Sequence, residues 1–233
     1  PYTTLFRSEE TVKVPVTVLP KVTPEGVKVL KDSTGLEEVV KAKATEAATA
    51  TTKLPDGVTV RVKEVKAETV PATTATGVQT PATVVVEYVK DGNAVASKEV
   101  KVPVTVVGST PKSLVVFEGD TVEAKTVQDA VTPGTDGTKG NPAIPEDLTK
   151  TPGKKEVTVP VTYEGVKDPE QVKVPVTVLP VAKGEVTVPK GETTDKVKEV
   201  AKAKAEEVAN SADFKAKLPD GAKDVEVGAI TEE

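Results

Sequence analysis

The 233-residue chain contains no cysteine, no histidine, no methionine and no tryptophan. Without cysteine it has no disulfide framework, no thiolate nucleophile and no cysteine-based zinc site. Without histidine it has no Ser–His–Asp triad, few routes to a transition-metal site and no side chain that ordinarily titrates at about pH 7. These absences exclude the commonest catalytic and metal-binding arrangements.

Aromatic residues are also scarce, at 3% of the chain. No apolar run approaches the roughly 18 residues that a membrane-spanning helix needs. The net charge of −5 and the pI of about 5.2 argue against a nucleic-acid-binding protein, which is usually basic. The sequence therefore predicts no nucleic-acid partner, no membrane span, no cofactor, and no catalytic or metal-binding residue.

Valine supplies most of the apolar content, at 46 of the 233 positions. Valine, leucine, isoleucine and phenylalanine together make up about a quarter of the chain, above the roughly 20% below which disorder is expected. At roughly 100–200 residues per domain, the length allows one or two ordinary domains or three small ones. We therefore expect folded domains with valine-rich cores.

Residues 1–8 read PYTTLFRS and share no pattern with the rest of the chain. The codons CCC TAC ACG ACG CTC TTC CGA TCT would encode them, and that string looks like a common sequencing-library adapter translated in frame. We interpret the segment as adapter sequence, the alternative being a genuine N-terminal segment, and leave it out of fold prediction. On this interpretation the chain is a piece of a longer protein.

A nine-residue segment occurs three times along the chain. It reads VKVPVTVLP at Val12–Pro20, VKVPVTVVG at Val100–Gly108 and VKVPVTVLP at Val172–Pro180. A second marker, LPDG, occurs at Leu54–Gly57 and again at Leu218–Gly221. Self-similarity of this kind is the sequence signature of a tandem array.

The markers divide the chain into consecutive repeats. We expect the closing strand of a preceding, truncated repeat at 9–21 and a long repeat at 22–108. A short repeat follows at 109–180, and a second long repeat, which is cut off, occupies 181–233. The short linkers between repeats contain proline and are expected to be stiff.

The nine-residue segment is predicted to be a strand, because valine alternates with lysine, proline and threonine at period 2. The valines should face the core. The central proline cannot donate to a neighbouring strand, so an edge position is expected. Further strands are predicted at Val58–Val62, Thr83–Val89 and Glu156–Thr162, and a type I turn is predicted at Leu54–Gly57.

Each long repeat is predicted to contain one short helix. In the first, Thr34 and Glu37 have the spacing of a capping box. In the second, one helical stripe is formed by Val197, Val200, Ala201, Ala205 and Val208. In the short repeat, the glycine- and proline-rich stretch 132–145 is predicted to be a loop in place of a helix.

Taken together, the motifs make up one order: LPDG, a TPG-like turn, a Val/Thr strand ending in tyrosine, and the closing VPVTV strand. The closing strand occurs three times, LPDG twice and the TPG-like turn once, as TPGKK at Thr151–Lys155. This order is similar to that of the Rib domain, the tandem repeat of the Rib and alpha-like cell-wall surface proteins of streptococci and lactobacilli. The resemblance covers essentially residues 9–233. It implies a mainly β chain of small immunoglobulin-like β-sandwiches, arranged in tandem as an elongated rod, with no catalytic residues.

Several polar residues could form sites, and each set has a structural alternative. Asp91-Gly92-Asn93 and Thr135-Asp136-Gly137 contain oxygen ligands suited to calcium but also fit ordinary turns. A Ser–Lys catalytic pair would need one of Ser33, Ser97, Ser109, Ser113 or Ser211, all of which fit caps, turns or linkers. A Lys–Asn isopeptide crosslink would need Asn93, Asn141 or Asn210 beside a buried lysine and a carboxylate.

Tyr88 and Tyr163 occupy the same place near the end of a predicted strand. The functional alternative is an aromatic that stacks on a ligand. The structural alternative is a core tyrosine whose hydroxyl bonds the backbone, and we favour it. The mixed Lys and Glu faces of the two predicted helices fit solvated surfaces better than binding patches.

These observations predict a non-catalytic stalk or spacer region of a cell-wall-anchored adhesin, located outside a Gram-positive cell. Anchoring to peptidoglycan would use parts of the parent protein that this chain does not contain. The alternative is that the repeats themselves bind a host protein or a glycan. That alternative predicts an exposed aromatic or apolar patch.

Overall fold

The computed structural model describes residues 16–219 and 225–230. The chain divides into two units, Pro1–Thr105 and Val106–Glu233, and both are mainly β with a few helices. The adapter-like segment 1–8 lies outside the described residues, as does most of the strand predicted at 9–21.

The first unit is built on a four-stranded sheet of order β1-β4-β3-β2. Its strands are β1 (Val27–Leu30), β2 (Val58–Val65), β3 (Gly77–Lys90) and β4 (Asn93–Val107). A two-residue turn, Asp91-Gly92, connects β3 to β4, and both of its residues have positive φ, at 49° and 81°. Positive φ at both positions is the requirement of a type I′ hairpin turn. A 3-10 turn at Ala67–Thr69 lies between β2 and β3.

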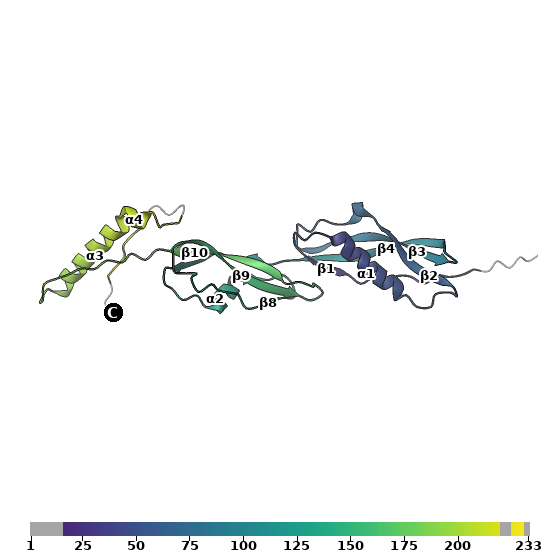
Figure 1. Ribbon diagram of the computed structural model, residues 1–233, viewed down its shortest axis with the longest axis horizontal. Helices are drawn as coiled ribbons and strands as arrows, with labels where there is room; N and C mark the ends of the chain where they lie inside the picture. The colour runs from purple at the N-terminus through teal and green to yellow at the C-terminus, as the bar shows by residue number, and fades with distance from the viewer. Residues whose placement is uncertain (1–15, 220–224, 231–233) are drawn as a thin grey trace, which may run out of the picture. The chain divides into compact units, whose positions relative to one another are not determined.

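Helix α1 (Leu36–Thr49) lies along this sheet and contacts β1, β2 and β3 (Figure 1). Its buried residues recur at helical spacing, at Leu36, Val40, Ala44 and Ala48. The strands supply the other half of the core with alternating residues, since β4 buries Val100, Val102, Val104 and Val106 while the side chains between them are exposed or half-buried. Sheet and helix are thus the two layers of this unit.

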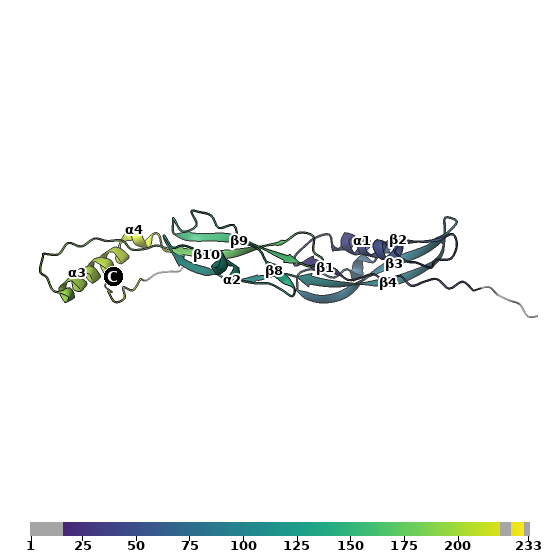
Figure 2. The ribbon, with the colours of Figure 1, turned by 90° about the horizontal axis from the view of Figure 1, so that it is seen from below.

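The second unit repeats the strand order of the first, as β6-β10-β9-β8. Its strands are β6 (Leu114–Phe117), β8 (Gly137–Lys139), β9 (Gly153–Tyr163) and β10 (Glu170–Leu179). β10 lies beside β9, to which it is antiparallel (Figure 2). It is parallel to β6. In both sheets the last strand therefore lies between the first strand and the one that precedes it in sequence.

Smaller elements complete the second unit. Strands β5 (Thr110–Pro111) and β7 (Val131–Thr132) form a two-stranded sheet, and helix α2 (Ala124–Asp129) contacts β7 and β9. The core again consists of alternating valines, Val157, Val159 and Val161 from β9 and Val172, Val174, Val176 and Val178 from β10.

Residues 181–219 contain two helices, α3 (Thr194–Asn210) and α4 (Ala212–Lys215), and neither this range nor 225–230 contains a strand. The predicted helix is confirmed, and the Thr193 side chain accepts a hydrogen bond from the Lys196 amide at its start. Its apolar stripe is only half-buried, however, with Ala209 the one buried residue of α3. The preceding segment runs beside the helix, since a Cβ on Gly184 would lie 3.2 Å from a methyl of Val208.

The closing strand is not an edge strand, so that prediction is wrong. β4 and β10 are inner strands of their sheets. The proline is tolerated because the parallel ladder with β6 begins only at Val176, one residue after Pro175. On that side the first half of β10 therefore has no β6 partner for a proline to disrupt. In the first unit Gly26, directly before β1, fits against Pro103, and a Cβ there would lie 3.4 Å from the proline ring.

The described part of the first nine-residue copy is not a strand. Residues 16–20 carry no strand assignment, and Val16 and Val18 are more than 80% exposed. The pattern that forms an inner strand in β4 and β10 here has no neighbouring strand to pair with. Period-2 valines alone are therefore not sufficient to make a strand.

Three local predictions are also corrected. Gly35, not Thr34, is the N-cap of α1, and no side-chain hydrogen bond caps the helix, because glycine has no side chain to accept one. The short repeat does have a helix, α2, although it is only six residues long, and its predicted loop contains β8.

The turn near LPDG begins one residue later than predicted. The Val58 amide donates to the Pro55 carbonyl at 3.0 Å, and Gly57 has φ of 74° at the third position. A type I turn has negative φ at that position, whereas glycine readily adopts the positive value.

Substituting Val102→Ala should lower the free energy of unfolding of the first unit. Val102 is fully buried, so the change removes two buried carbons and leaves a cavity, at about 1.5–3 kcal/mol. Val95→Ala is the matched control, because Val95 lies on the same strand but is 55% exposed, and it should change stability by less than about 0.5 kcal/mol. Chemical denaturation followed by circular dichroism would measure both, and equal effects would contradict the assigned faces of β4.

Candidate functional site

The most specific polar contacts of the chain involve the two tyrosines Tyr88 and Tyr163. Tyr88 lies near the end of β3, and Tyr163 is the last residue of β9. Each ring is packed in its unit with only 4% of the residue exposed. In both units the hydroxyl reaches the linker that precedes the sheet.

In the first unit the Tyr88 hydroxyl donates a hydrogen bond to the carbonyl oxygen of Pro20. Pro20 ends the nine-residue segment that precedes the first sheet, and Val22, two residues later, is buried. Burial raises the pKa of the Tyr88 phenol, so the hydroxyl keeps the proton that it donates. The prediction of a core tyrosine with a backbone partner is confirmed here.

In the second unit the Tyr163 hydroxyl is the centre of a larger network. It donates to Glu170 Oε2 at 3.1 Å, lies 2.8 Å from Ser109 Oγ, and accepts from the Gly134 amide at 3.3 Å. Ser109 also donates directly to the same carboxylate, through its amide to Oε1 at 3.1 Å and through its hydroxyl to Oε2 at 2.6 Å. Four segments of the second unit therefore meet at one hydroxyl.

The electrostatics of this network keep the phenol protonated. Burial is the largest influence and raises the pKa of Tyr163, and the neighbouring Glu170 carboxylate raises it further. The contacts with the Ser109 hydroxyl and the Gly134 amide act in the opposite direction and only partly offset these effects. The arrangement is that of a structural hydrogen-bond donor rather than of a phenolate base or nucleophile.

Two glycines allow the network to close. A Cβ on Gly134 would lie 2.6 Å from the Gly108 carbonyl oxygen, and a Cβ on Gly137 would lie 2.7 Å from a ring carbon of Tyr163. Any larger residue at either position would push the linker or the tyrosine away. The glycines of the stretch predicted as a loop thus serve close packing around the linker.

The remaining polar candidates have structural roles. Asp136 has φ of 63° within a turn that the Gly137 amide closes on Gly134, and Asn93 Nδ2 donates to the Asp91 carbonyl at 3.2 Å. Within the described ranges no group of three or more acidic side chains could hold a metal ion. The two candidate calcium-loop fragments therefore lie at turns, which fits their structural alternative.

Two of the remaining candidate serines and two of the candidate asparagines also have hydrogen-bond partners. Ser33 Oγ donates to Leu30 O at 2.6 Å, and Ser211 caps α4 by accepting the Phe214 amide. Gln128 Nε2 donates to Asn141 Oδ1 at 3.3 Å, and Asn210 Nδ2 donates to the Glu206 carbonyl at 3.0 Å. Ser109 was expected to be an ordinary linker residue, and its place in the Tyr163 network has no signal in the sequence.

A shallow pocket of about 390 Å³ lies between the segment Pro20–Glu25 and helix α1 in the first unit. Of the two lysines that line it, Lys43 is 2.9 Å from carboxylate oxygens of both Glu25 and Glu46. These two hydrogen bonds raise the pKa of Lys43, so the amine is a paired cation and not a base.

A second charged cluster lies across β2 and β3. Glu87 is largely buried, and its carboxylate lies 3.0 Å from Arg61 and 3.3 Å from Lys63. The hydrogen bond from Arg61, followed by that from Lys63, lowers the pKa of Glu87, and this outweighs the effect of burial. The cluster is a cross-strand ion pair of the sheet rather than an acid–base site.

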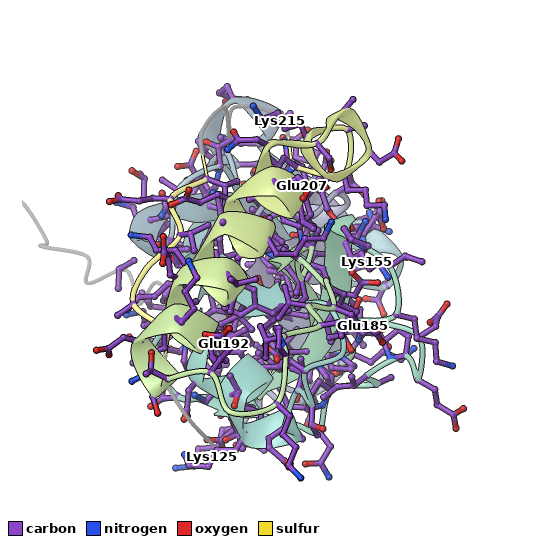
Figure 3. All side chains as sticks on the ribbon, turned by 90° about the vertical axis from the view of Figure 1, so that its left-hand side faces the viewer. Lys125, Lys155, Glu185, Glu192, Glu207 and Lys215 are labelled. Atoms are coloured by element: carbon purple, nitrogen blue, oxygen red, sulfur yellow. The ribbon has the colours of Figure 1, made fainter. Side chains whose placement is uncertain are left out.

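The helical faces carry both signs of charge, as predicted. Lys196 pairs with Glu199 at 3.1 Å and Lys204 with Glu207 at 2.8 Å along α3. Figure 3 shows Glu207 on this helix and Lys215 on the following helix α4. None of the helices that the structure describes combines the length and the apolar character needed to cross a bilayer.

One aromatic side chain is exposed among the described residues. Phe117 is 52% exposed at the end of β6, and Val115 on the same face of that strand is 63% exposed. Phe214, by contrast, is buried against the C-terminal helices. Two exposed apolar side chains are ordinary on a protein surface and do not by themselves mark an interaction site.

Comparison with known proteins identifies no family. No protein-family model and no curated protein matches the chain. Among solved structures, the chain is similar to human mucin-like protocadherin EC1-2, with 12% identity over 68% of this chain and 97% of that chain and a TM-score of 0.19. It is also similar to an endo-fucoidan hydrolase from glycoside hydrolase family 107, with 11% identity over 54% of this chain and 24% of that chain and a TM-score of 0.17. Likenesses this weak carry no argument about function.

Substituting Tyr163→Phe should destabilise the second unit while leaving the ring in place. The change leaves the Gly134 amide and the Glu170 carboxylate each one partner short, and because both groups are half-buried the cost should be the roughly 0.5–1.5 kcal/mol of a typical hydrogen bond. Thr162→Val is the control, because it also removes a hydroxyl but from the exposed neighbour, and it should cost less than about 0.5 kcal/mol. If denaturant unfolding gives the same loss of unfolding free energy for Tyr163→Phe as for the control, the hydroxyl network does not stabilise the unit.

Proposed function

We propose that the chain is a non-catalytic structural spacer. It is a stretch of tandem Rib-type, immunoglobulin-like repeats from the stalk of a cell-wall-anchored surface protein of a Gram-positive bacterium. The parent protein is attached to peptidoglycan through parts that lie outside this chain, and the stalk is displayed on the outside of the cell.

The observation that carries the proposal is that one design occurs in both units. Each has four strands in the same order, with the closing VPVTV strand in an inner position. Each also has a buried tyrosine whose hydroxyl bonds the linker before the sheet, at Pro20 in one case and at Ser109 in the other. A design that is repeated and that holds its own linker suits a spacer better than an enzyme, which needs one differentiated site.

The chemistry of the described residues supports the same proposal. The tyrosines are protonated donors, Lys43 is paired with two carboxylates, and Glu87 is paired with Arg61 and Lys63. None of these groups has the combination of a nucleophile, a base and a pocket that an active site requires.

The alternative, direct binding of a host protein or glycan, retains one supporting observation. Val115 and Phe117 are exposed side by side on one face of β6. Two isolated apolar side chains are ordinary on a protein surface. We therefore place binding second to the spacer role.

Small-angle X-ray scattering of the whole chain tests the spacer proposal. Linkers that contain proline and are tied to the sheet should hold successive repeats apart, so an extended particle is expected. The radius of gyration should clearly exceed about 17 Å, the value for a compact globule of this length. A value near about 17 Å would mean that the repeats fold back on one another, and would overturn the proposal.

A further inference from the structure

The first and last main strands of the second unit lie side by side and run in the same direction. The ladder joins β6 to β10 from Leu114 opposite Val176 to Phe117 opposite Leu179. Beyond its end, the Glu118 amide donates to the Leu179 carbonyl at 2.8 Å. The preceding chain therefore leaves this ladder at one end and the following chain leaves it at the other.

We propose that this strand pair is a mechanical clamp that lets the second unit resist tension along the polypeptide. Tension on the two flanking segments pulls β6 and β10 in opposite directions along their common axis. All the hydrogen bonds of the ladder then carry the force together, because the strands can part only by sliding past one another. If the same strands were peeled apart from one end, the bonds would break one at a time.

The Ser109 contacts extend the clamp to the other end of β10. Glu170 is the first residue of β10, and it holds Ser109 through the serine amide at 3.1 Å and the serine hydroxyl at 2.6 Å. Strand β5, which follows Ser109, also contacts β10. The segment from Ser109 to Phe117 is thus fixed to β10 near both ends, and both attachments oppose the same sliding motion.

This arrangement keeps tension from reaching the other elements of the unit. Helix α2 and strands β7, β8 and β9 all lie between β6 and β10 in the sequence. Force that enters before β6 and leaves after β10 reaches them only after the clamp has opened. Resistance to rapid extension is set by the rate of unfolding and not by equilibrium stability, so a local clamp is sufficient to provide it.

The inference goes beyond the spacer proposal, because it concerns strand topology within one unit. A compact particle in scattering would overturn the spacer role and leave the clamp intact. A weak response to shear would overturn the clamp and leave the spacer role intact.

Single-molecule force spectroscopy on the whole chain tests the clamp directly. The chain has no cysteine, so substituted cysteines are unique attachment points. Handles at Lys112→Cys and Val181→Cys pull the ladder in shear, since these exposed positions flank its opposite ends. Handles at Thr121→Cys and Val181→Cys pull from the same end and peel it. The two chains share one handle, and their equilibrium stabilities should match.

The rupture force of the second unit should be several-fold higher for the shear pair than for the peeling pair at the same pulling speed. Equal rupture forces in the two geometries would overturn the proposal, because the rupture force of a unit without a clamp should not depend on whether the ladder is sheared or peeled.

Two proline substitutions locate the clamp within the ladder. The Glu118 amide points to β10, whereas the Phe117 amide donates away from it, to Asp120 Oδ2 at 2.7 Å. Alternation along the strand places the Val116 amide on the β10 side and the Val115 amide on the opposite side. Val116→Pro therefore removes a ladder donor, and Val115→Pro is its matched control.

In the shear geometry, Val116→Pro should lose most of the rupture force that exceeds the value for the peeling pair, whereas Val115→Pro should retain it. If both variants rupture at the same force, the ladder is not the element that resists tension, and the proposal fails.

Discussion

The structure depends on the closing strand of each sheet, which pairs with a neighbouring strand on each side and buries its valine face. The chain has no disulfide and few aromatic residues, so its cores consist of β-branched side chains that pack best on a pleated sheet. β4 and β10 meet this requirement because strands flank them on both sides and a layer of helix or loop covers their inward valines. The same sequence at Val16–Pro20 has no such neighbours, and its valines are exposed. The nine-residue segment therefore forms a strand only where neighbouring strands are present to pair with it.

The linker contacts follow from that constraint. With the closing strand placed in the middle, the first strand must lie at its outer side, and the chain leading into the unit must pass the end of the sheet. Tyr88 and Tyr163 lie at that end, and their hydroxyls form hydrogen bonds with the entering segment at Pro20 and Ser109. Sheet order, linker position and tyrosine placement are thus consequences of one arrangement. The clamp formed by β6 and β10 is a further consequence, because the arrangement makes the first and last strands neighbours.

Periodicity predicted the parts of this fold that depend on local pattern. The valine strands, the helix from Leu36, the helix from about Asp195 and the buried tyrosines all follow from alternation or helical spacing, which a single segment contains. Strand order depends on pairing between distant segments, so the edge position inferred from Pro103 and Pro175 was wrong. Proline disrupts a strand only on the edge where its missing amide would have donated to a neighbouring strand. The start of β6, which decides whether such a neighbour faces Pro175, cannot be read from the sequence. Ser109, Gly134 and Gly137 resembled ordinary linker and loop residues, because their contacts with Tyr163 and the linker exist only in the folded unit.

Hydrogen exchange of the whole chain, resolved by residue with NMR, tests most directly whether flanking on both sides creates the order seen in the closing strands. Amides of Val100–Val107 and Val172–Val178 should be among the slowest to exchange, since they lie in inner strands over a buried core. The valine-containing stretch Glu185–Val188 belongs to no strand, and its amides should exchange at nearly unprotected rates. Comparable protection in Glu185–Val188 and Val100–Val107 would contradict the account, because valine alternation would then confer order without neighbouring strands.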